Sequence, residues 1–276
     1  MPVITTNTAA NSAVRYLNIN SKDQSDSLSK LASGSRINQA SDDAAGLAIS
    51  TRISSDITAL SQAATNASHG VAVLQTADGG ASNISDILQR MKTLASQASS
   101  GTVTDTERTY INAEFSQLID EIDGTATSTR YNGKSLLDGT SSAFAGSGTT
   151  VMVGSDATDT ITVSIATLTA TALSVDSLTV STQSDATAAL TSLDTAIDTV
   201  SKARADIGAI ESRFEFRSES IATQQENLEA ANSAIEDVDI ASEEAKLASS
   251  EVKTQAAVAA AAQANQMPQE LLKLLQ

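Results

Sequence analysis

Apolar residues recur at steps of three and four over long stretches of the 276-residue chain. The first stretch averages 3.5 residues per step, which is typical of coiled-coil helices; it comprises Ile53, Ile57, Leu60, Ala64, Ala67, Val71 and Leu74. An apolar residue is due next at position 78, where the sequence has Asp78-Gly79-Gly80, and the pattern then resumes. Its later members are Ala81, Ile84, Leu88, Met91 and Ala95. The sequence predicts a long helix with a local break or kink at the glycine pair.

A second long helix is predicted from about residue 187 to residue 236. Its apolar seam contains no proline and consists of Leu190, Leu193, Ile197, Val200, Ile207, Phe214, Ile221, Leu228 and Ile235. Such a helix is roughly 75 Å long, at about 1.5 Å per residue. That exceeds what a compact domain needs, so we expect this helix to lie along a partner helix.

The two ends of the chain have weaker helical patterns. Near the start, Val14, Leu17, Leu28 and Leu31 have helical spacing, but the polar Ser21 and Gln24 occupy positions where apolar residues are due. Near the end, residues 256–264 are almost all alanine, which favours helix, and Pro268 is predicted to interrupt it before an apolar tail. That tail is Leu271, Leu272, Leu274 and Leu275. We expect both segments to need a partner in order to fold.

The middle of the chain has a different character. Of the 45 residues from Thr140 to Ser184, 20 are Ser or Thr. Ile161, Val163 and Ile165 alternate with polar residues as strands do, and the further strand candidates are Leu173, Val175, Leu178 and Val180. Before them, a short helix is predicted over residues 107–122 and a turn at Tyr131-Asn132-Gly133.

Together these elements predict a mainly α fold. It is an elongated antiparallel bundle of long coiled-coil helices with a small β-hairpin element inserted in the middle. Because the two longest helices flank the insertion, the chain runs out and returns, which brings its termini together at one end.

Composition supports thin helical seams rather than a wide core, since 3% of residues are aromatic and none is Trp. The formal charge of −16 lies mostly in the middle and C-terminal parts, and it argues against nucleic acid and anionic membranes as partners. No apolar stretch is long enough to predict a transmembrane helix, and the first residues lack the pattern of a cleaved signal peptide. By itself, this pattern favours a cytoplasmic protein.

Few residues suggest chemistry. The chain has no cysteine, which excludes disulfides and thiolate chemistry, and its one histidine, His69, cannot build a metal site or triad alone. The acidic pairs Asp42/Asp43, Glu236/Asp237 and Glu243/Glu244 have no pocket-forming aromatic residues nearby, so a solvated or inter-subunit role is favoured. We therefore predict no catalytic residue, no metal site and no cofactor.

Four motifs resemble those of bacterial flagellins. The longest is SGSRINQASDDAAGLAI at residues 33–49, and the others are RYNGKSLLDG at 130–139, AIEDVDIASE at 234–243 and AQANQMPQELLKLL at 262–275. The resemblance covers about residues 1–140 and 187–276. It implies a structural subunit, not an enzyme, that polymerises into the extracellular bacterial flagellar filament for swimming motility. Export unfolded through the flagellar type III system would explain the missing signal peptide.

The resemblance also implies a domain division and partners. Residues 1–35 and 240–276 correspond to a terminal helical core domain that folds on assembly, 36–139 and 186–239 to a helical rod domain, and 140–185 to a small Ser/Thr-rich β element. The implied partners are other flagellin subunits, flagellar cap and junction proteins, and an export chaperone at the C-terminal helix.

Three groups of residues are expected to serve contacts or modification. Inter-subunit or joint roles are expected for Arg36, Asp42 and Asp43 and for the apolar Val14, Leu17, Leu28, Leu31, Leu271, Leu272, Leu274 and Leu275. The segment 88–97 resembles the flagellin surface read by a Toll-like receptor, and the matching positions are Gln89, Arg90, Leu94 and Glu114, although Lys92 and Thr93 depart from the family pattern. O-glycosylation is expected at Thr140, Ser141, Ser142, Ser147, Thr149, Ser155, Thr158 and Thr160.

Other interpretations stay open at this point. The receptor motif is equally consistent with a solvated or filament-buried face, and the Ser/Thr content with strands and loops that carry no glycan. A hook-filament junction protein shares the terminal helices, and a secreted adhesin or immune ligand could use the same rod. An enzyme would need an inserted catalytic domain, and the sequence has no HExxH motif.

Overall fold

The computed structural model describes residues 7–139, 144, 146 and 148–274, with side chains as far as Met267. The chain divides into two compact units. The terminal unit comprises residues 1–57 and 226–276, and the central unit comprises residues 58–225.

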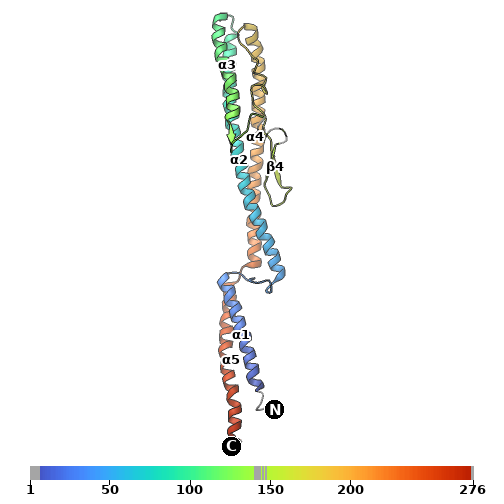
Figure 1. Cartoon of the computed structure of the whole chain (residues 1–276), viewed down its shortest axis with the longest axis vertical. Coiled ribbons are helices and arrows are strands. Elements are labelled where there is room, and N and C mark those ends of the chain that lie inside the picture. Colours follow the sequence, from blue (N-terminus) through green and yellow to red (C-terminus); the bar gives the residue numbers. More distant parts are fainter. Residues whose placement is uncertain (1–6, 140–143, 145, 147, 275–276) are drawn as a thin grey trace. The chain divides into compact units, whose positions relative to one another are not determined.

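Five helices and four short strands make up the described chain (Figure 1). The helices are α1 (Thr8–Ser33), α2 (Ala44–Ala98), α3 (Asp105–Ser128), α4 (Gln183–Glu236) and α5 (Ile240–Leu274). The strands are β1 (Arg130–Tyr131), β2 (Lys134–Ser135), β3 (Thr149–Met152) and β4 (Thr160–Val163). The predicted mainly α class with a small β insertion is confirmed.

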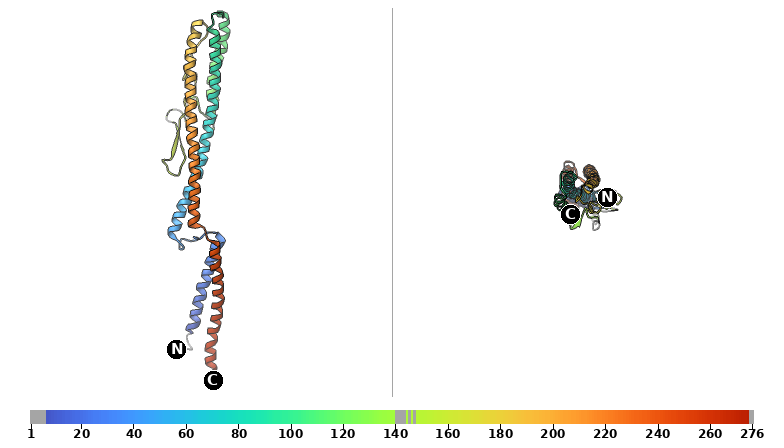
Figure 2. Two further views of the ribbon diagram at one scale, coloured as in Figure 1. Left: turned by 180° about the vertical axis from the view of Figure 1, so that it is seen from behind. Right: turned by 90° about the horizontal axis from the view of Figure 1, so that it is seen from above.

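In the central unit, α2 and α4 lie side by side and antiparallel (Figure 2). Polar pairs connect them along their length, since Gln75 bonds to Glu211 (3.0 Å) and Lys92 pairs with Asp194. Buried apolar residues recur at steps of three and four on α2, at Leu74, Ala77, Ala81, Ile84, Leu88 and Met91. On α4 they recur at steps of three, four or seven, at Leu193, Ala196, Val200, Ala203, Ile207, Phe214 and Ile221. Most of the predicted seam is confirmed, although Ala196 rather than Ile197 takes the fully buried position.

The glycine pair does not break α2, which runs without interruption from Ala44 to Ala98. A Cβ atom at Gly80 would overlap Thr129 Oγ1 and lie 2.8 Å from Leu137 Cδ1, whereas one at Gly79 would meet open space. Gly80 therefore lets the segment after α3 approach the helix closely. The predicted break is wrong because this packing holds a glycine in helical conformation.

The insertion contains two hairpins. Asn132 (φ 48°) and Gly133 (φ 76°) form the turn between β1 and β2, which confirms the predicted turn, and β3 pairs with β4 in the register Thr149↔Val163. The strand predicted around residues 173–180 is wrong. That segment is irregular, and α3 holds it because Asn112 Oδ1 accepts the Val180 N–H (2.8 Å). Its alternating apolar residues, Leu173, Val175 and Val180, are buried without a strand partner.

In the terminal unit, α1 and α5 pack antiparallel. Ser27 Oγ donates to Glu243 Oε1 (2.7 Å), and at the other end Asn7 Nδ2 donates to the Ala264 carbonyl (2.7 Å). On α5, the buried and half-buried side chains follow a seven-residue repeat of alternating steps of four and three. Most of them are small or polar: Glu243, Leu247, Ser250, Thr254, Ala257, Ala261 and Ala264. The packing is therefore thin.

Pro268 does not end α5, which continues to Leu274. A proline has no N–H to donate, so in a helix it leaves the carbonyl four residues earlier without its usual partner. That carbonyl belongs to Ala264, and the Asn7 side chain donates to it. The predicted interruption is wrong because Asn7, the residue that caps α1, supplies a hydrogen bond in place of the missing one.

Candidate assembly surfaces

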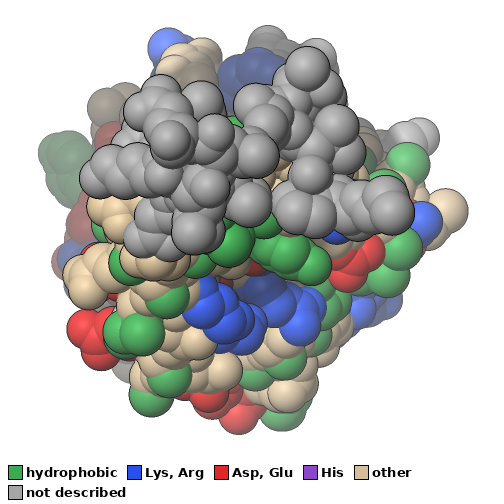
Figure 3. All heavy atoms as spheres, turned by 90° about the horizontal axis from the view of Figure 1, so that it is seen from below, with side chains coloured by type: hydrophobic (Ala, Val, Ile, Leu, Met, Phe, Trp, Pro, Cys, Tyr) green, Lys and Arg blue, Asp and Glu red, His purple; other side chains and the backbone are tan. Residues whose placement is uncertain are grey.

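The outer faces of α1 and α5 expose apolar side chains. Val14 and Leu28 on α1 are 48% and 58% exposed, and Val252 and Val258 on α5 are 66% and 52% exposed. Leu17 and Leu31 are half-buried, so only part of the predicted N-terminal seam is covered by the chain itself. Seen end-on from below, the described side chains that Figure 3 shows are a mixture of hydrophobic and charged ones. Such a surface is apolar area that a second molecule can cover.

The predicted apolar tail is described in part. Leu271, Leu272 and Leu274 belong to α5, but their side chains lie outside the described residues. Leu275 lies outside them altogether.

Arg36 connects the segment after α1 to the end of α4. Its backbone N–H donates to the Glu236 carbonyl (2.5 Å), and its guanidinium donates to the Ile235 carbonyl (2.5 Å). Both acceptors are carbonyls at the C-terminal end of a helix, where a cation is favourable. The structure therefore gives Arg36 a defined partner within its own chain.

The two aspartates predicted beside Arg36 act locally. Asp42 Oδ2 accepts the N–H groups of Asn38 (3.1 Å) and Gln39 (3.2 Å), and Asp43 Oδ1 accepts the N–H of Gly46 (2.9 Å). They shape the turn before α2 and satisfy donors in its first residues. Among the described residues, no ion pair joins Arg36 to either aspartate.

Sequence reasoning missed the polar cluster between α1 and α5. Glu243 is 6% exposed and accepts hydrogen bonds from Lys246 Nζ (2.9 Å) and Ser27 Oγ (2.7 Å). These two bonds, that from Lys246 first, hold the pKa of the Glu243 carboxyl below its usual range. Apolar spacing places Leu28 rather than Ser27 in the helical seam, and no local pattern reveals a partner 216 residues away.

Of the expected receptor-contact residues, Arg90 and Glu114 meet on the surface. Arg90 donates two hydrogen bonds to Glu114 Oε1 (2.9 and 2.7 Å), from α2 to α3. Gln89 is exposed beside them. Leu94, however, is 3% exposed and belongs to the core of the central unit, so its side chain is not part of this exposed surface.

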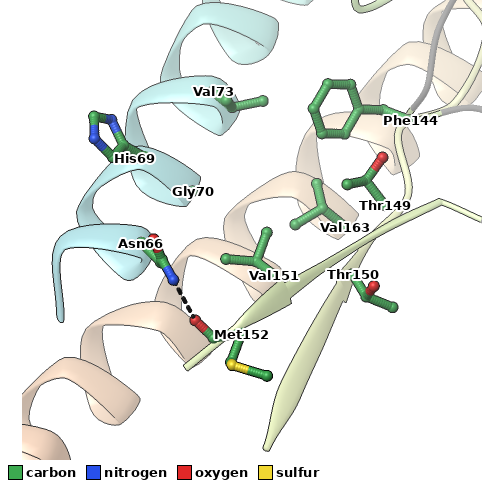
Figure 4. A pocket seen from close by; sticks show the side chains of 10 residues that line it. All are labelled: Asn66, His69, Gly70, Val73, Phe144, Thr149, Thr150, Val151, Met152 and Val163. Atoms are coloured by element: carbon green, nitrogen blue, oxygen red, sulfur yellow. Dashed lines mark hydrogen bonds between the residues drawn. The ribbon is translucent and has the colours of Figure 1, made fainter. Parts of the chain in front are cut away.

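The β3–β4 hairpin packs against both long helices of the central unit. Arg217 of α4 donates to the Val153 carbonyl (3.0 Å) and to Asp159 Oδ1 (2.6 Å). From α2, Asn66 Nδ2 donates to the Met152 carbonyl (3.2 Å), and a partly apolar pocket lies between helix and hairpin (Figure 4). His69 at its edge lies 3.3 Å from the Tyr131 hydroxyl, so its role here is a structural contact.

The expected glycosylation positions divide into two sets. Thr149 lies in β3 and Thr160 in β4, and Ser155 and Thr158 are exposed in the turn that joins these strands. Thr140, Ser141, Ser142 and Ser147 lie outside the described residues.

Across the described part of the chain, no three His, Asp or Glu side chains come together as metal ligands would. Among the described helices, none combines the length and apolarity needed to cross a membrane.

Comparison with known proteins identifies the family of the chain. Residues 4–142 match the bacterial flagellin N-terminal helical region, and residues 190–275 match the bacterial flagellin C-terminal helical region. The chain belongs to the bacterial flagellin family.

Curated relatives match over nearly their whole length. The flagellar filament 30.7 kDa core protein of Treponema maltophilum is 38% identical, with 99% of each chain covered, and the flagellin of Bacillus subtilis is 37% identical, with 98% of each covered. The crystal structure of Bacillus cereus flagellin has 32% identity and a TM-score of 0.51, covering 61% of this chain and 94% of that one. Flagellins are structural proteins, so the prediction that the chain is not an enzyme is confirmed.

Proposed function

We propose that this flagellin is the structural subunit of an extracellular bacterial flagellar filament used for swimming. The observation that carries the proposal is the exposed apolar surface of α1 and α5, including Leu28 at 58% and Val252 at 66% exposure. A thin seam of small and polar residues joins these two helices, whereas the central unit buries large side chains such as Phe115 and Phe214. Neighbouring copies supply the cover that the chain lacks.

Folding of the terminal segments is coupled to assembly in this proposal. Residues 1–35 and 240–276 form the filament core domain, 36–139 and 186–239 the rod domain, and 140–185 the β element. A long helix that buries little apolar surface gains little from folding alone. Order in α1 and α5 therefore depends on their neighbours in the polymer.

The other partners follow from the same role. The chain passes unfolded through the flagellar type III system, with an export chaperone on the C-terminal helix, and meets cap and junction proteins at the ends of the filament. The lack of cysteine suits such passage, because no disulfide can form before export. Nucleic acid and membrane are not partners of an acidic chain of this kind.

Two further roles are proposed for the central unit. The Arg90–Glu114 pair with Gln89 forms the exposed part of a Toll-like receptor contact, which a reporter-cell assay with purified monomer tests. O-glycans on the Ser/Thr-rich insertion would raise the intact mass above the 28.3 kDa of the bare chain. A mass equal to the bare chain would exclude them.

The principal experiment is polymerisation of the purified chain. After seeding with filament fragments or addition of a precipitating salt, negative-stain microscopy should show long helical filaments. Discrete soluble rods would contradict the proposal and favour a junction protein or a secreted ligand with the same rod.

A further inference from the structure

One stretch of α4 in the central unit, residues 213–222, carries two different surfaces. At 100° per residue, positions 213, 216, 217 and 220 share one face, and positions 215, 218, 219 and 222 share another, about 160° away. The first face borders the β3–β4 hairpin, and the second borders α2. The two surfaces therefore lie on nearly opposite sides of the helix at the same level.

The first surface presents an aromatic side chain to solvent. Phe216 is 72% exposed, although the chain has only four phenylalanines, two of which, Phe115 and Phe214, are fully buried. Arg213 and Arg217 flank it. Arg217 also binds Asp159 (2.6 Å), so Arg213 carries more of the positive charge of this surface. Aromatic and arginine side chains are enriched at protein–protein interfaces, so this surface is suited to contact another protein.

The second surface is a groove of about 490 Å³ between α2 and α4. Small or apolar side chains line it: Ala67, Ser68, Val71, Phe214, Ser218 and Ala222. Glu215 and Glu219 stand at its edge and are exposed. The groove thus pairs an apolar floor with negative charge, the complement of the Phe216 surface.

We propose that Phe216 of one copy inserts into the Ala67/Val71/Ala222 groove of the next copy, with Arg213 facing the Glu219 carboxylate. The inference rests on the proposed polymer and identifies a lateral contact within it. Because the two surfaces differ and lie on opposite sides, each copy can insert its Phe216 into one neighbour and accept the Phe216 of another in its own groove. A head-to-tail contact of this kind adds copy after copy into an open helical filament, unless the rotation between copies closes the assembly into a cyclic oligomer.

Thiol cross-linking tests this geometry, since the native chain has no cysteine. Ser220→Cys marks the Phe216 surface, Ser218→Cys marks the groove, and both retain Phe216. Filaments grown from an equal mixture of the two variants should give covalent dimers with a short bis-maleimide linker, whereas filaments of either variant alone should give none. Ser116→Cys on α3, mixed with Ser218→Cys, is the matched control and should also give none.

Absence of dimers in the mixed filaments would overturn the inference. Dimers from Ser220→Cys alone would also overturn it, because they would place two copies of the same surface together.

A second measurement uses the critical concentration for polymerisation. Phe216→Ala should raise it about tenfold, as expected for an interface anchor. Arg213→Glu should also raise it, and Glu219→Arg in the same chain should restore it, since each copy then carries the reversed pair. If the wild-type chain forms filaments and Phe216→Ala has the same critical concentration, this contact alone is contradicted. Failure of the wild-type chain to form filaments would contradict the proposed function as well.

Discussion

At the scale of single residues, the terminal unit depends on a few polar contacts. Asn7 has two roles: its Oδ1 accepts the N–H of Ala10 (3.0 Å) at the start of α1, and its Nδ2 donates to the Ala264 carbonyl (2.7 Å). The second bond compensates for Pro268. Together with Ser27–Glu243, it determines the register of α1 against α5.

The role of Asn7 predicts a coupling with Pro268. Asn7→Asp keeps the helix cap but removes the donor, so it should raise the critical concentration for polymerisation about fivefold, the equivalent of one hydrogen bond. In a Pro268→Ala background the effect should be smaller, because the alanine has a backbone N–H that can donate to the Ala264 carbonyl. Equal effects in the two backgrounds would show that Asn7 does not compensate for the proline.

Glu243 predicts a dependence on pH. Its lowered pKa means that the carboxylate stabilises the folded form at neutral pH and that this contribution is lost as the pH falls through the lowered pKa. Glu243→Gln should raise the critical concentration about five- to tenfold near pH 7. At a pH well below the ordinary glutamate pKa of about 4.3, the critical concentrations of Glu243→Gln and of the wild type should become equal.

The matched control is Glu244→Gln, which changes the neighbouring exposed carboxylate. We expect little effect from it at neutral pH. A constant ratio for Glu243→Gln across the acid range would contradict the assigned contact.

At the scale of elements, apolar spacing predicted the helices and their buried seams because these follow from periodicity alone. The features that apolar spacing did not predict depend on contacts between segments far apart in the sequence. Gly80 stays helical because Thr129 and Leu137 pack against it, and the residues around Val175 are irregular because α3 supplies their hydrogen-bond partners. The Arg36–Ile235 and Ser27–Glu243 contacts join residues about 200 positions apart, which local patterns cannot reveal.

The two adjacent glycines of α2 give a direct test of this packing. Gly80→Ala should lower the free energy of unfolding of the central unit by about 1–3 kcal/mol, since its Cβ would overlap Thr129. Gly79→Ala should raise it by about 0.5–1 kcal/mol, because alanine favours helix and its Cβ meets open space. Thermal unfolding followed by circular dichroism measures both. Equal shifts in the same direction would contradict the described packing.

A charge on the outer face of α1 should weaken assembly without changing the stability of the central unit. Leu28→Asp should raise the critical concentration more than about tenfold, because a charge would replace apolar area that neighbours cover. Unfolding of the central unit should not change. Asn18→Asp introduces the same charge at an exposed polar position of α1 and should have a much smaller effect. Similar effects of both substitutions would indicate general repulsion.

At the scale of the whole molecule, each copy carries a net charge of −16, so bringing copies together is opposed by electrostatic repulsion. The covered apolar faces of α1 and α5 and the Phe216 contact have to outweigh it. Added salt screens this repulsion over a Debye length of about 10 Å at 0.1 M. Polymerisation should accordingly become more favourable as ionic strength rises.

In the proposed filament, neighbouring copies cover the exposed apolar faces of the terminal helices. Hydroxyl-radical footprinting of the unpolymerised chain and of filaments, read out by mass spectrometry, measures this cover residue by residue. We expect strong reaction in the unpolymerised chain and strong protection in filaments at Val14, Leu28, Val252 and Val258. Equal reactivity of these residues in both states would contradict this cover.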